Sequence, residues 1–351
     1  MLHAGGPSTF ADHRLEEWWR GAPKGRGNQL WTHYLMGAGT EHWDLVDSLA
    51  DSSVVAAQVR HAALNPAGEN ILHVTVVTKD YVRLALNWAL ALERAFTAPA
   101  YLIGCLDKVA CRDLAALGVG LPHILDLRNA TAGGPAVVVG EPEWLERSTQ
   151  ATARSVQALG RTGRFWWQRL SLVRMLLREV GPGHLVAMSD ADVVWVRPPE
   201  AGSAWRNPTA DLIASQGTFP ADVYSAWGTT ICMGLAVWRS SSRTLALLAA
   251  ALDDLARTRD DQVSVNRLLV QLDTAWGEGA LPHHGRTALG LPLEVVLIPT
   301  VEAPRECPRE AMSTLQHTAV AFHCLIPKAP TDKERALQEL SLWLVPARDR
   351  V

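Results

Sequence analysis

The chain has 351 residues, a net charge of −3 and a hydrophobic fraction of 48%, which together indicate a globular protein with a large core. This near-neutral charge and the lack of any Lys/Arg run argue against a nucleic-acid partner. No stretch reaches the roughly 20 apolar residues of a membrane span, and residues 1–28 lack the apolar segment of a signal peptide. We therefore expect no transmembrane segment in this chain.

Strand-like and helix-like segments alternate from residue 71 onward. Strands are predicted at 71–77, 100–106, 123–127, 184–188, 212–215, 231–238, 294–298 and 320–325. Helices are predicted at 81–96, 109–117, 165–180, 243–256, 263–272 and 331–344. Alternation of this kind predicts an α/β protein with parallel strands joined by crossover helices. Residues 1–68 are interpreted as an N-terminal extension that packs on a catalytic domain of residues 69–351.

The cysteines are five in number and include no Cys-x-x-Cys pair. Most of them lie in apolar runs, so we expect buried free thiols rather than a disulfide framework. One pair could still be oxidised in a secretory compartment.

Two carboxylates, Asp190 and Asp192, directly follow the strand predicted at 184–188. Side chains two residues apart point to the same side of an extended chain, so both could bind one ion. Oxygen ligands suit Mn²⁺ or Mg²⁺. A solvated turn after a strand would give the same Asp-x-Asp pattern, and the spacing alone leaves that alternative open.

Other polar residues also follow predicted strands, where α/β sheets bind their ligands. Thr78 and Lys79 follow the first strand, and Asp107 follows the second. The sequence contains neither G-x-G-x-x-G nor G-x-x-x-x-G-K-[ST]. The phosphates of a bound nucleotide would therefore need a metal ion and basic side chains.

Several short motifs carry a resemblance to a known family. They are, in chain order, LNW (86–88), LD (106–107), SDADVVWVRPP (189–199), CMGLAVWR (232–239) and DDQVSVN (260–266). Over roughly residues 70–330 the chain resembles the nucleotide-diphospho-sugar transferases. These are retaining GT-A glycosyltransferases that include plant and algal cell-wall arabinosyl-, xylosyl- and galactosyltransferases. The resemblance implies a single GT-A domain, which is Rossmann-like with a mostly parallel central sheet and helices on both faces.

The resemblance also implies roles for individual residues. Asp190 and Asp192 match the acids that hold Mn²⁺ or Mg²⁺ against the sugar-nucleotide diphosphate, and His323 matches a third metal ligand. Asp261 and Gln262 match a catalytic acid–amide pair beside the donor sugar. Residues that match donor-binding positions are Thr75, Val77, Thr78, Asp107, Arg169 with Arg174 as its alternative, Ser189 and Lys328. The Lys328 match is loose, because Ile326-Pro327 replaces a glycine that is common there.

Each of these residues also has a structural explanation. Asp261 and Asp107 could cap the helices that follow them. Arg169 could lie along the surface of its helix, and His323 could be a core histidine. His283-His284 is interpreted as a surface loop rather than a second metal site.

The expected function is metal-dependent transfer of a sugar, with retention, from a UDP-sugar to the hydroxyl of a glycan or glycoprotein. Acceptor contacts are expected from residues 134–164 and 203–230. The alternatives are a catalytically inactive relative that binds nucleotide-sugar or glycan, and a sugar-1-phosphate nucleotidyltransferase.

Overall fold

The computed structural model describes residues 71–117, 137–139, 159–200, 202–277, 283–288, 292–325 and 329–346. The predicted N-terminal extension, residues 1–68, and the strand predicted at 123–127 lie outside the described residues. Among the described helices, none is both long and apolar enough to cross a membrane.

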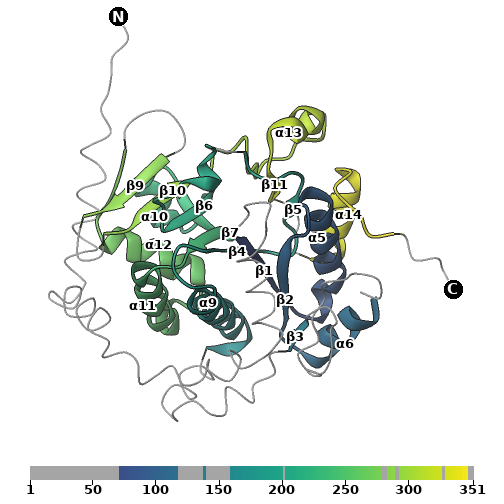
Figure 1. Cartoon of the computed structure of the whole chain (residues 1–351), viewed down its shortest axis with the longest axis horizontal. Coiled ribbons are helices and arrows are strands. Elements are labelled where there is room, and N and C mark those ends of the chain that lie inside the picture. Colours follow the sequence, from purple (N-terminus) through teal and green to yellow (C-terminus); the bar gives the residue numbers. More distant parts are fainter. Residues whose placement is uncertain are drawn as a thin grey trace, which may run out of the picture.

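A central sheet organises the described part of the chain (Figure 1). Its strands in spatial order are β3 (Val137–Val139), β2 (Ala100–Cys105), β1 (Ile71–Val77), β4 (Leu185–Ser189), β7 (Thr230–Arg239), β6 (Leu212–Gly217), β10 (Glu294–Leu297), β9 (His283–Thr287) and β8 (Thr274–Trp276). Only β7 and β9 of this sheet pair antiparallel with both neighbours. The remaining strands share one direction, so the sheet is mixed but mostly parallel.

Helices cover both faces of this sheet (Figure 1). One face carries α9 (Gly160–Val180), α11 (Ser242–Thr258) and α12 (Asp261–Gln271), and the other carries α5 (Val82–Ala95), α6 (Lys108–Leu117) and α14 (Pro330–Glu339). Strand β1 shows why, because it is mostly apolar and is buried on both faces along its whole length. Its Leu72 and Val74 enter the α9 core, whereas Ile71 and Val77 enter the α5 core. The expected α/β fold class, with a single domain and helices on both faces, is confirmed.

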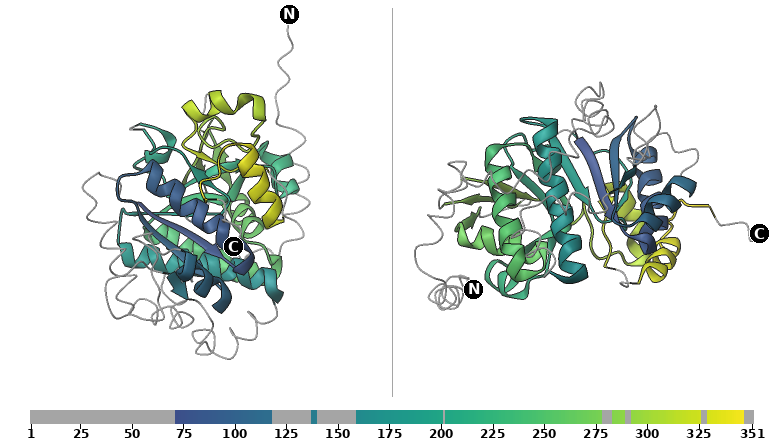
Figure 2. Two further views of the ribbon diagram at one scale, coloured as in Figure 1. Left: turned by 90° about the vertical axis from the view of Figure 1, so that its right-hand side faces the viewer. Right: turned by 90° about the horizontal axis from the view of Figure 1, so that it is seen from below.

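Shorter elements complete the fold. They are the helices α10 (Ala221–Trp227) and α13 (Met312–Thr318), the 3-10 turns Lys79–Tyr81, Ala204–Arg206 and Arg309–Ala311, and the strands β5 (Val194–Trp195) and β11 (Ala321–Phe322). Strands β5 and β11 pair with each other outside the central sheet. Helix α14 lies against α5 (Figure 2). This places the last described helix beside the first described α-helix.

Several predicted boundaries differ from the structure. The helix predicted at 165–180 begins earlier, at Gly160. Glycine disfavours a helix interior, so the sequence around Gly160 and Gly163 does not indicate this first turn. The strand predicted at 320–325 keeps two residues, and the last helix ends at Glu339 rather than at 344. His283 and His284 do not lie in a loop: they belong to strand β9, which pairs with β10 on one side and β8 on the other.

The cysteine prediction was wrong for part of the set. Cys307 and Cys324 form a disulfide, and Cys105 is also disulfide-bonded. Cys232 is the free, buried thiol among the described residues. Apolar surroundings are equally typical of buried thiols and of buried disulfides, so the local pattern could not separate them.

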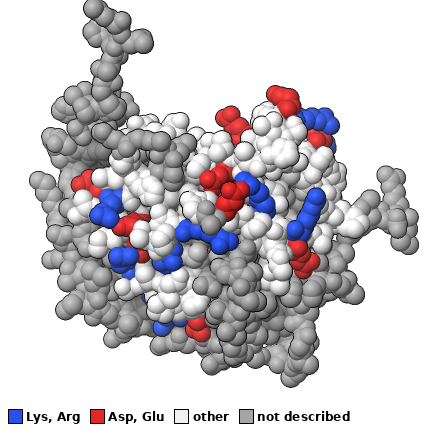
Figure 3. All heavy atoms as spheres, turned by 45° about the horizontal axis from the view of Figure 1, so that its top comes forward, with Lys and Arg blue, Asp and Glu red and all other residues white. Residues whose placement is uncertain are grey.

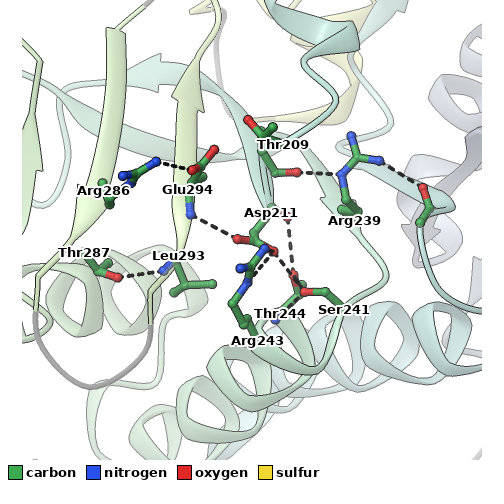
Figure 4. A network of polar contacts seen from close by, with 12 residues as sticks. Thr209, Asp211, Arg239, Ser241, Arg243, Thr244, Arg286, Thr287, Leu293 and Glu294 are labelled. Atoms are coloured by element: carbon green, nitrogen blue, oxygen red, sulfur yellow. Dashed lines mark hydrogen bonds and ion pairs between the residues drawn. The ribbon is translucent and has the colours of Figure 1, made fainter.

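A buried acidic network lies at the edge of the sheet where β6 begins (Figure 4). The Asp211 carboxylate accepts hydrogen bonds from Ser241 Oγ at 2.9 Å, from Arg243 Nη2 at 3.0 Å and from Glu294 N at 3.0 Å. These contacts join β6, β10 and the start of α11. Asp211 precedes β6, whereas Asp190 follows β4, which runs parallel to β6. The two carboxylates therefore lie at opposite ends of the strands, on opposite edges of the sheet. We interpret the Asp211 network as structural.

Candidate metal and donor site

The acid pair meets a histidine from a distant part of the sequence. Asp190 follows β4, and its backbone N–H donates to the Gly234 carbonyl of β7 at 2.8 Å. His323 follows β11, and its Nε2 lies 3.6 Å from Asp190 Oδ2. One ligand atom from each of Asp190, Asp192 and His323 falls within 4.8 Å of the others. Two carboxylates and one imidazole are a donor set that suits Mn²⁺, so these residues fit the expected ion.

Arg169 links this group to a third acid. It is 3% exposed, and its Nη1 lies 2.5 Å from Asp190 Oδ1. Its Nε donates to Asp261 Oδ2 at 2.8 Å, and its Nη2 contacts the same oxygen. The guanidinium also stacks on the Trp166 ring, 4.5 Å from the ring centroid. Arg169 therefore does not lie on the surface of α9, because its buried guanidinium group is positioned between the carboxylates of Asp190 and Asp261.

Asp261 is available for this pairing because its neighbour caps the helix. Asp260 is the N-cap of α12, and its Oδ1 accepts from Val263 N at 2.9 Å. The capping explanation therefore belongs to Asp260, and Asp261 points to Arg169 instead. Burial raises the pKa of Asp261 to about 6, even though the Arg169 guanidinium acts to lower it.

Gln262 connects the site to a neighbouring loop. Its Oε1 accepts from Met233 N of β7 at 3.0 Å, and its Nε2 donates to Phe219 O at 2.6 Å. The Phe219 side chain is half exposed. Gln262 therefore fixes the position of this aromatic loop relative to strand β7, next to Gly234.

The far side of His323 contacts two residues that sequence reasoning did not single out. Cys232 Sγ lies 3.7 Å from His323 Nδ1, and Arg305 Nη1 lies 3.3 Å from the same nitrogen. Arg305 also contacts the Cys232 sulfur. Burial acts to raise the pKa of the Cys232 thiol, but His323 and Arg305 lower it to about 7. With these partners at Nδ1, the Nε2 atom of His323 faces Asp190.

Lys333 is the third residue that the sequence did not indicate. It lies on α14, and its ammonium contacts Asp192 Oδ2. Asp192 is 4% exposed, so this ion pair is largely shielded from water. Lys328, the lysine implied by the resemblance, lies outside the described residues. Only the position of Lys333 in the first turn of a predicted helix could have drawn attention to it.

The donor-binding candidates divide into two groups. Asp107 contacts the residue after Thr78, because Asp107 Oδ2 accepts from Lys79 N at 2.8 Å. Asp107 Oδ1 accepts from Ala110 N at 2.7 Å, so the same side chain also caps α6. Thr75 and Val77 lie inside the buried strand β1, and their side chains face the core.

Ser189 and Arg174 point away from the acid pair. Ser189 Oγ accepts from Trp88 Nε1 of α5 at 2.7 Å inside the core. Arg174 Nε donates to Leu245 O of α11 at 3.4 Å, so the structure does not bring Arg174 to Asp190 as it does Arg169.

The electrostatics of the site keep Asp190 ionised. Burial acts to raise its pKa, but Arg169, His323 and Lys333 together lower the pKa of Asp190 below its usual value. Metal ligands must be deprotonated, and this environment holds Asp190 in that form. The face in Figure 3 shows acidic and basic groups side by side rather than one large field of a single sign.

Gly234 leaves no room for a side chain, which makes it a sharp test of the site. A Cβ there would stand 2.7 Å from Asp190 Oδ2 and 2.8 Å from His323 Nε2, and would also collide with His323 Cε1. We expect Gly234→Ala to separate Asp190 from His323 and to lower Mn²⁺ affinity by about 10- to 100-fold, as loss of ligand orientation does. Calorimetric titration with Mn²⁺ measures this.

The matched control is Gly277→Ala, whose Cβ would meet, among the described residues, just His284 O at 3.5 Å, an ordinary contact distance. It should bind Mn²⁺ as the wild type does. Wild-type Mn²⁺ affinity in folded Gly234→Ala would contradict the assignment of His323 and Asp190 to one metal site.

The solved structures to which the chain is similar include glycosyltransferases. The chain is similar to the bifunctional glycosyltransferase WbbM, with a TM-score of 0.44 and 11% identity over 77% of this chain and 49% of that one. It thus spans about half the length of WbbM. It is also similar to the galactosyltransferase LgtC in complex with donor and acceptor sugar analogs, with a TM-score of 0.45 and 12% identity over 79% of this chain and 98% of that one. For mouse xyloside xylosyltransferase 1 the TM-score is 0.38, with 9% identity over 72% and 96%.

Comparison of the sequence identifies the family more specifically than these structural similarities do. No curated protein sequence matches the chain significantly. A family model does match: it is described as nucleotide-diphospho-sugar transferase and covers residues 97–324, well over half of the chain. The matched region includes Asp190, Asp192, Arg169, Asp261 and His323. The chain therefore belongs to the nucleotide-diphospho-sugar transferase family.

Proposed function

We propose that this protein is a metal-dependent, retaining glycosyltransferase that moves a sugar from a UDP-sugar to a glycan or glycoprotein hydroxyl. The observation that supports this most directly is the convergence of Asp190, Asp192 and His323 within 4.8 Å. Beside them the buried Arg169–Asp261 pair extends the polar site toward the loop at Phe219. Membership of the family supports the assignment to the transferases, and the arrangement of these side chains supports the proposed metal dependence.

The chemistry of transfer accounts for these residue types. The leaving nucleoside diphosphate must be stabilised as the glycosidic bond breaks, and a bound Mn²⁺ would supply Lewis-acid stabilisation of that charge. Asp190, Asp192 and His323 would hold the ion. The sugar ring develops positive charge as the bond breaks, and nearby carboxylates stabilise that charge. Asp190 and Asp261, held on either side of Arg169, are the acids that would provide it.

The burial of Asp261 bears on how the configuration is retained. A carboxylate that attacks the sugar needs an accessible oxygen, but Asp261 is 2% exposed and both of its Arg169 contacts fall on Oδ2. We therefore propose that Asp261 positions Arg169 and contributes negative charge. Retention would then follow from attack of the acceptor on the same face from which the diphosphate leaves.

Acceptor contacts are proposed at the loop that Gln262 holds. Phe219 in this loop and Tyr224 on the following helix α10 are both exposed, and aromatic rings with an exposed face stack on the apolar face of a sugar. Both lie within the expected acceptor segment 203–230. Most of the other expected acceptor segment, 134–164, lies outside the described residues.

A donor panel tests the proposed function. We expect UDP and UDP-sugars to raise the melting temperature only when Mn²⁺ is present, because the acid pair repels a free diphosphate. At a ligand concentration 100 times Kd the stabilisation is about 2.7 kcal/mol, a shift of several degrees. GDP and the metal-free UDP arm are the controls. An equal shift with UDP in EDTA would argue against metal-dependent donor binding.

The same panel separates transfer from binding alone. Slow hydrolysis of the preferred UDP-sugar without an acceptor, measured as released UDP, is expected of an active transferase. Tight, Mn²⁺-dependent UDP-sugar binding without any hydrolysis or transfer would instead identify a catalytically inactive relative.

A further inference from the structure

Lys333 stands on the metal-binding face of the site, where a divalent ion is expected. Its ammonium contacts Asp192 Oδ2, although 141 residues separate the two in the sequence. We propose that Lys333 is a built-in counter-cation: it neutralises Asp192 in the metal-free protein, and the divalent ion displaces it toward the donor diphosphate. This inference rests on the metal-dependent function proposed above, and it adds a competition between the metal and a residue of the chain.

Asp192 needs such a partner. It is the buried member of the acid pair, at 4% exposed compared with 34% for Asp190. A buried carboxylate without a partner is strongly destabilising, so an empty metal site has to be compensated from within the protein. Arg169 already serves Asp190 and Asp261. Among the described residues, Lys333 is the cation that contacts Asp192.

Lys333 is itself buried more deeply than an ordinary surface lysine. Its side chain is 15% exposed, whereas Arg335, two residues later on the same helix, is 67% exposed. Lysine is rarely buried unless its charge is paired. The side chain is therefore directed into the site by its contact with Asp192, and it does not simply cover the surface of α14.

The metal ion and the ammonium compete for the same carboxylate. Asp192 contributes one of the three ligand atoms that lie within 4.8 Å of one another, and Lys333 contacts an oxygen of that carboxylate. Two cations a few ångströms apart in a poorly hydrated site repel each other strongly. Binding of the divalent ion therefore weakens the Lys333–Asp192 contact, and that contact in turn lowers the affinity for the ion.

Helix α14 remains in place during this exchange. Glu334, next to Lys333, pairs with Arg83 of α5 at 2.7 Å, and Leu337 is buried against the same core. The flexible four-carbon stem of lysine can move its ammonium without moving the helix. Lys333 would thus stay within reach of the metal-bound diphosphate, whose negative charge attracts it once Asp192 binds the ion.

The experiment is an Mn²⁺ titration of Lys333→Gln, with free Mn²⁺ measured by electron paramagnetic resonance. Without nucleotide, we expect the variant to bind Mn²⁺ about tenfold more tightly than the wild type, which is the scale of such couplings. With Mn²⁺ saturating, we expect it to bind UDP about tenfold more weakly, because a cation near the diphosphate is lost. Arg335→Gln, which removes an exposed charge from the same helix, should match the wild type in both titrations.

Two further variants keep the test decisive. Lys333→Arg retains the positive charge and should keep the low Mn²⁺ affinity of the wild type. If Lys333→Gln is unstable, saturating Mn²⁺ should restore its melting temperature, because the ion replaces the missing cation; failure of this rescue would overturn the inference.

Two outcomes distinguish the inference from the function on which it rests. Unchanged or weaker Mn²⁺ binding by folded Lys333→Gln, with normal binding by the wild type, overturns the counter-cation role alone. A wild-type protein that binds UDP but no Mn²⁺ overturns the metal-dependent function, and the counter-cation role with it.

Discussion

Replacing Asp192 with asparagine is expected to weaken Mn²⁺-dependent UDP binding by roughly 100-fold or more while the fold survives. The change removes the charge of one of three candidate ligands but keeps the shape of a buried side chain. Outer-sphere partners of a metal typically contribute 10- to 100-fold to affinity, so loss of a ligand should cost roughly 100-fold or more. Asparagine is a better choice than alanine here, because its oxygen can still accept a hydrogen bond from Lys333. Calorimetric titration with UDP, with and without Mn²⁺, measures the loss.

Asp211→Asn is the control for this experiment. Asp211 is also a buried, ion-paired carboxylate, but it lies at the opposite edge of the sheet. Breaking its network should lower the melting temperature and leave Mn²⁺-dependent UDP affinity unchanged. If Asp192→Asn instead binds UDP in Mn²⁺ as tightly as the wild type does, Asp192 is not a metal ligand.

The local features of the site could be predicted from the sequence. Asp190 and Asp192 stand directly after a strongly apolar strand, as expected. They lie in a turn rather than on an extended chain, because Val193 N donates to Asp190 O at 3.0 Å. The order of strands and helices followed from the alternation of their patterns. Such features depend on neighbouring residues alone, so the sequence contains most of the information that fixes them.

The partners of these acids could not be predicted in the same way. Lys333 and Arg305 reach the site through the packing of segments far from β4, and no local pattern marks either residue. The disulfide between Cys307 and Cys324 fixes the segments that carry Arg305 and His323, but apolar surroundings did not separate it from free thiols. Long-range contacts of this kind depend on how the elements pack together.

The helix cap at α12 illustrates a smaller ambiguity. Asp260 and Asp261 are adjacent carboxylates before one helix, and either could have been the capping residue. The structure gives the cap to Asp260, and burial beside Arg169 gives Asp261 a different role. Of these two adjacent carboxylates, Asp260 therefore stabilises the start of the helix, whereas Asp261 belongs to the candidate site.

Asp261→Asn is expected to lower kcat by roughly 100- to 1000-fold, the scale of removing one preorganised electrostatic group. The neutral amide can neither hold Arg169 through a charged contact nor offset positive charge on the sugar. Because Arg169 is buried, its partial loss of pairing should also reduce stability by roughly 3 kcal/mol, so the assay is run well below the melting temperature.

The pH dependence separates this role from a purely structural one. Burial raises the pKa of Asp261 to about 6, and the proposed role requires the ionised form. Wild-type kcat should therefore fall as pH decreases through about 6, because Asp261 becomes protonated and neutral. Asp261→Asn already carries a neutral side chain, so its low rate should lack this acidic limb. If the variant keeps the wild-type acidic limb, another group is responsible for it. Wild-type kcat in the variant would remove Asp261 from the mechanism altogether.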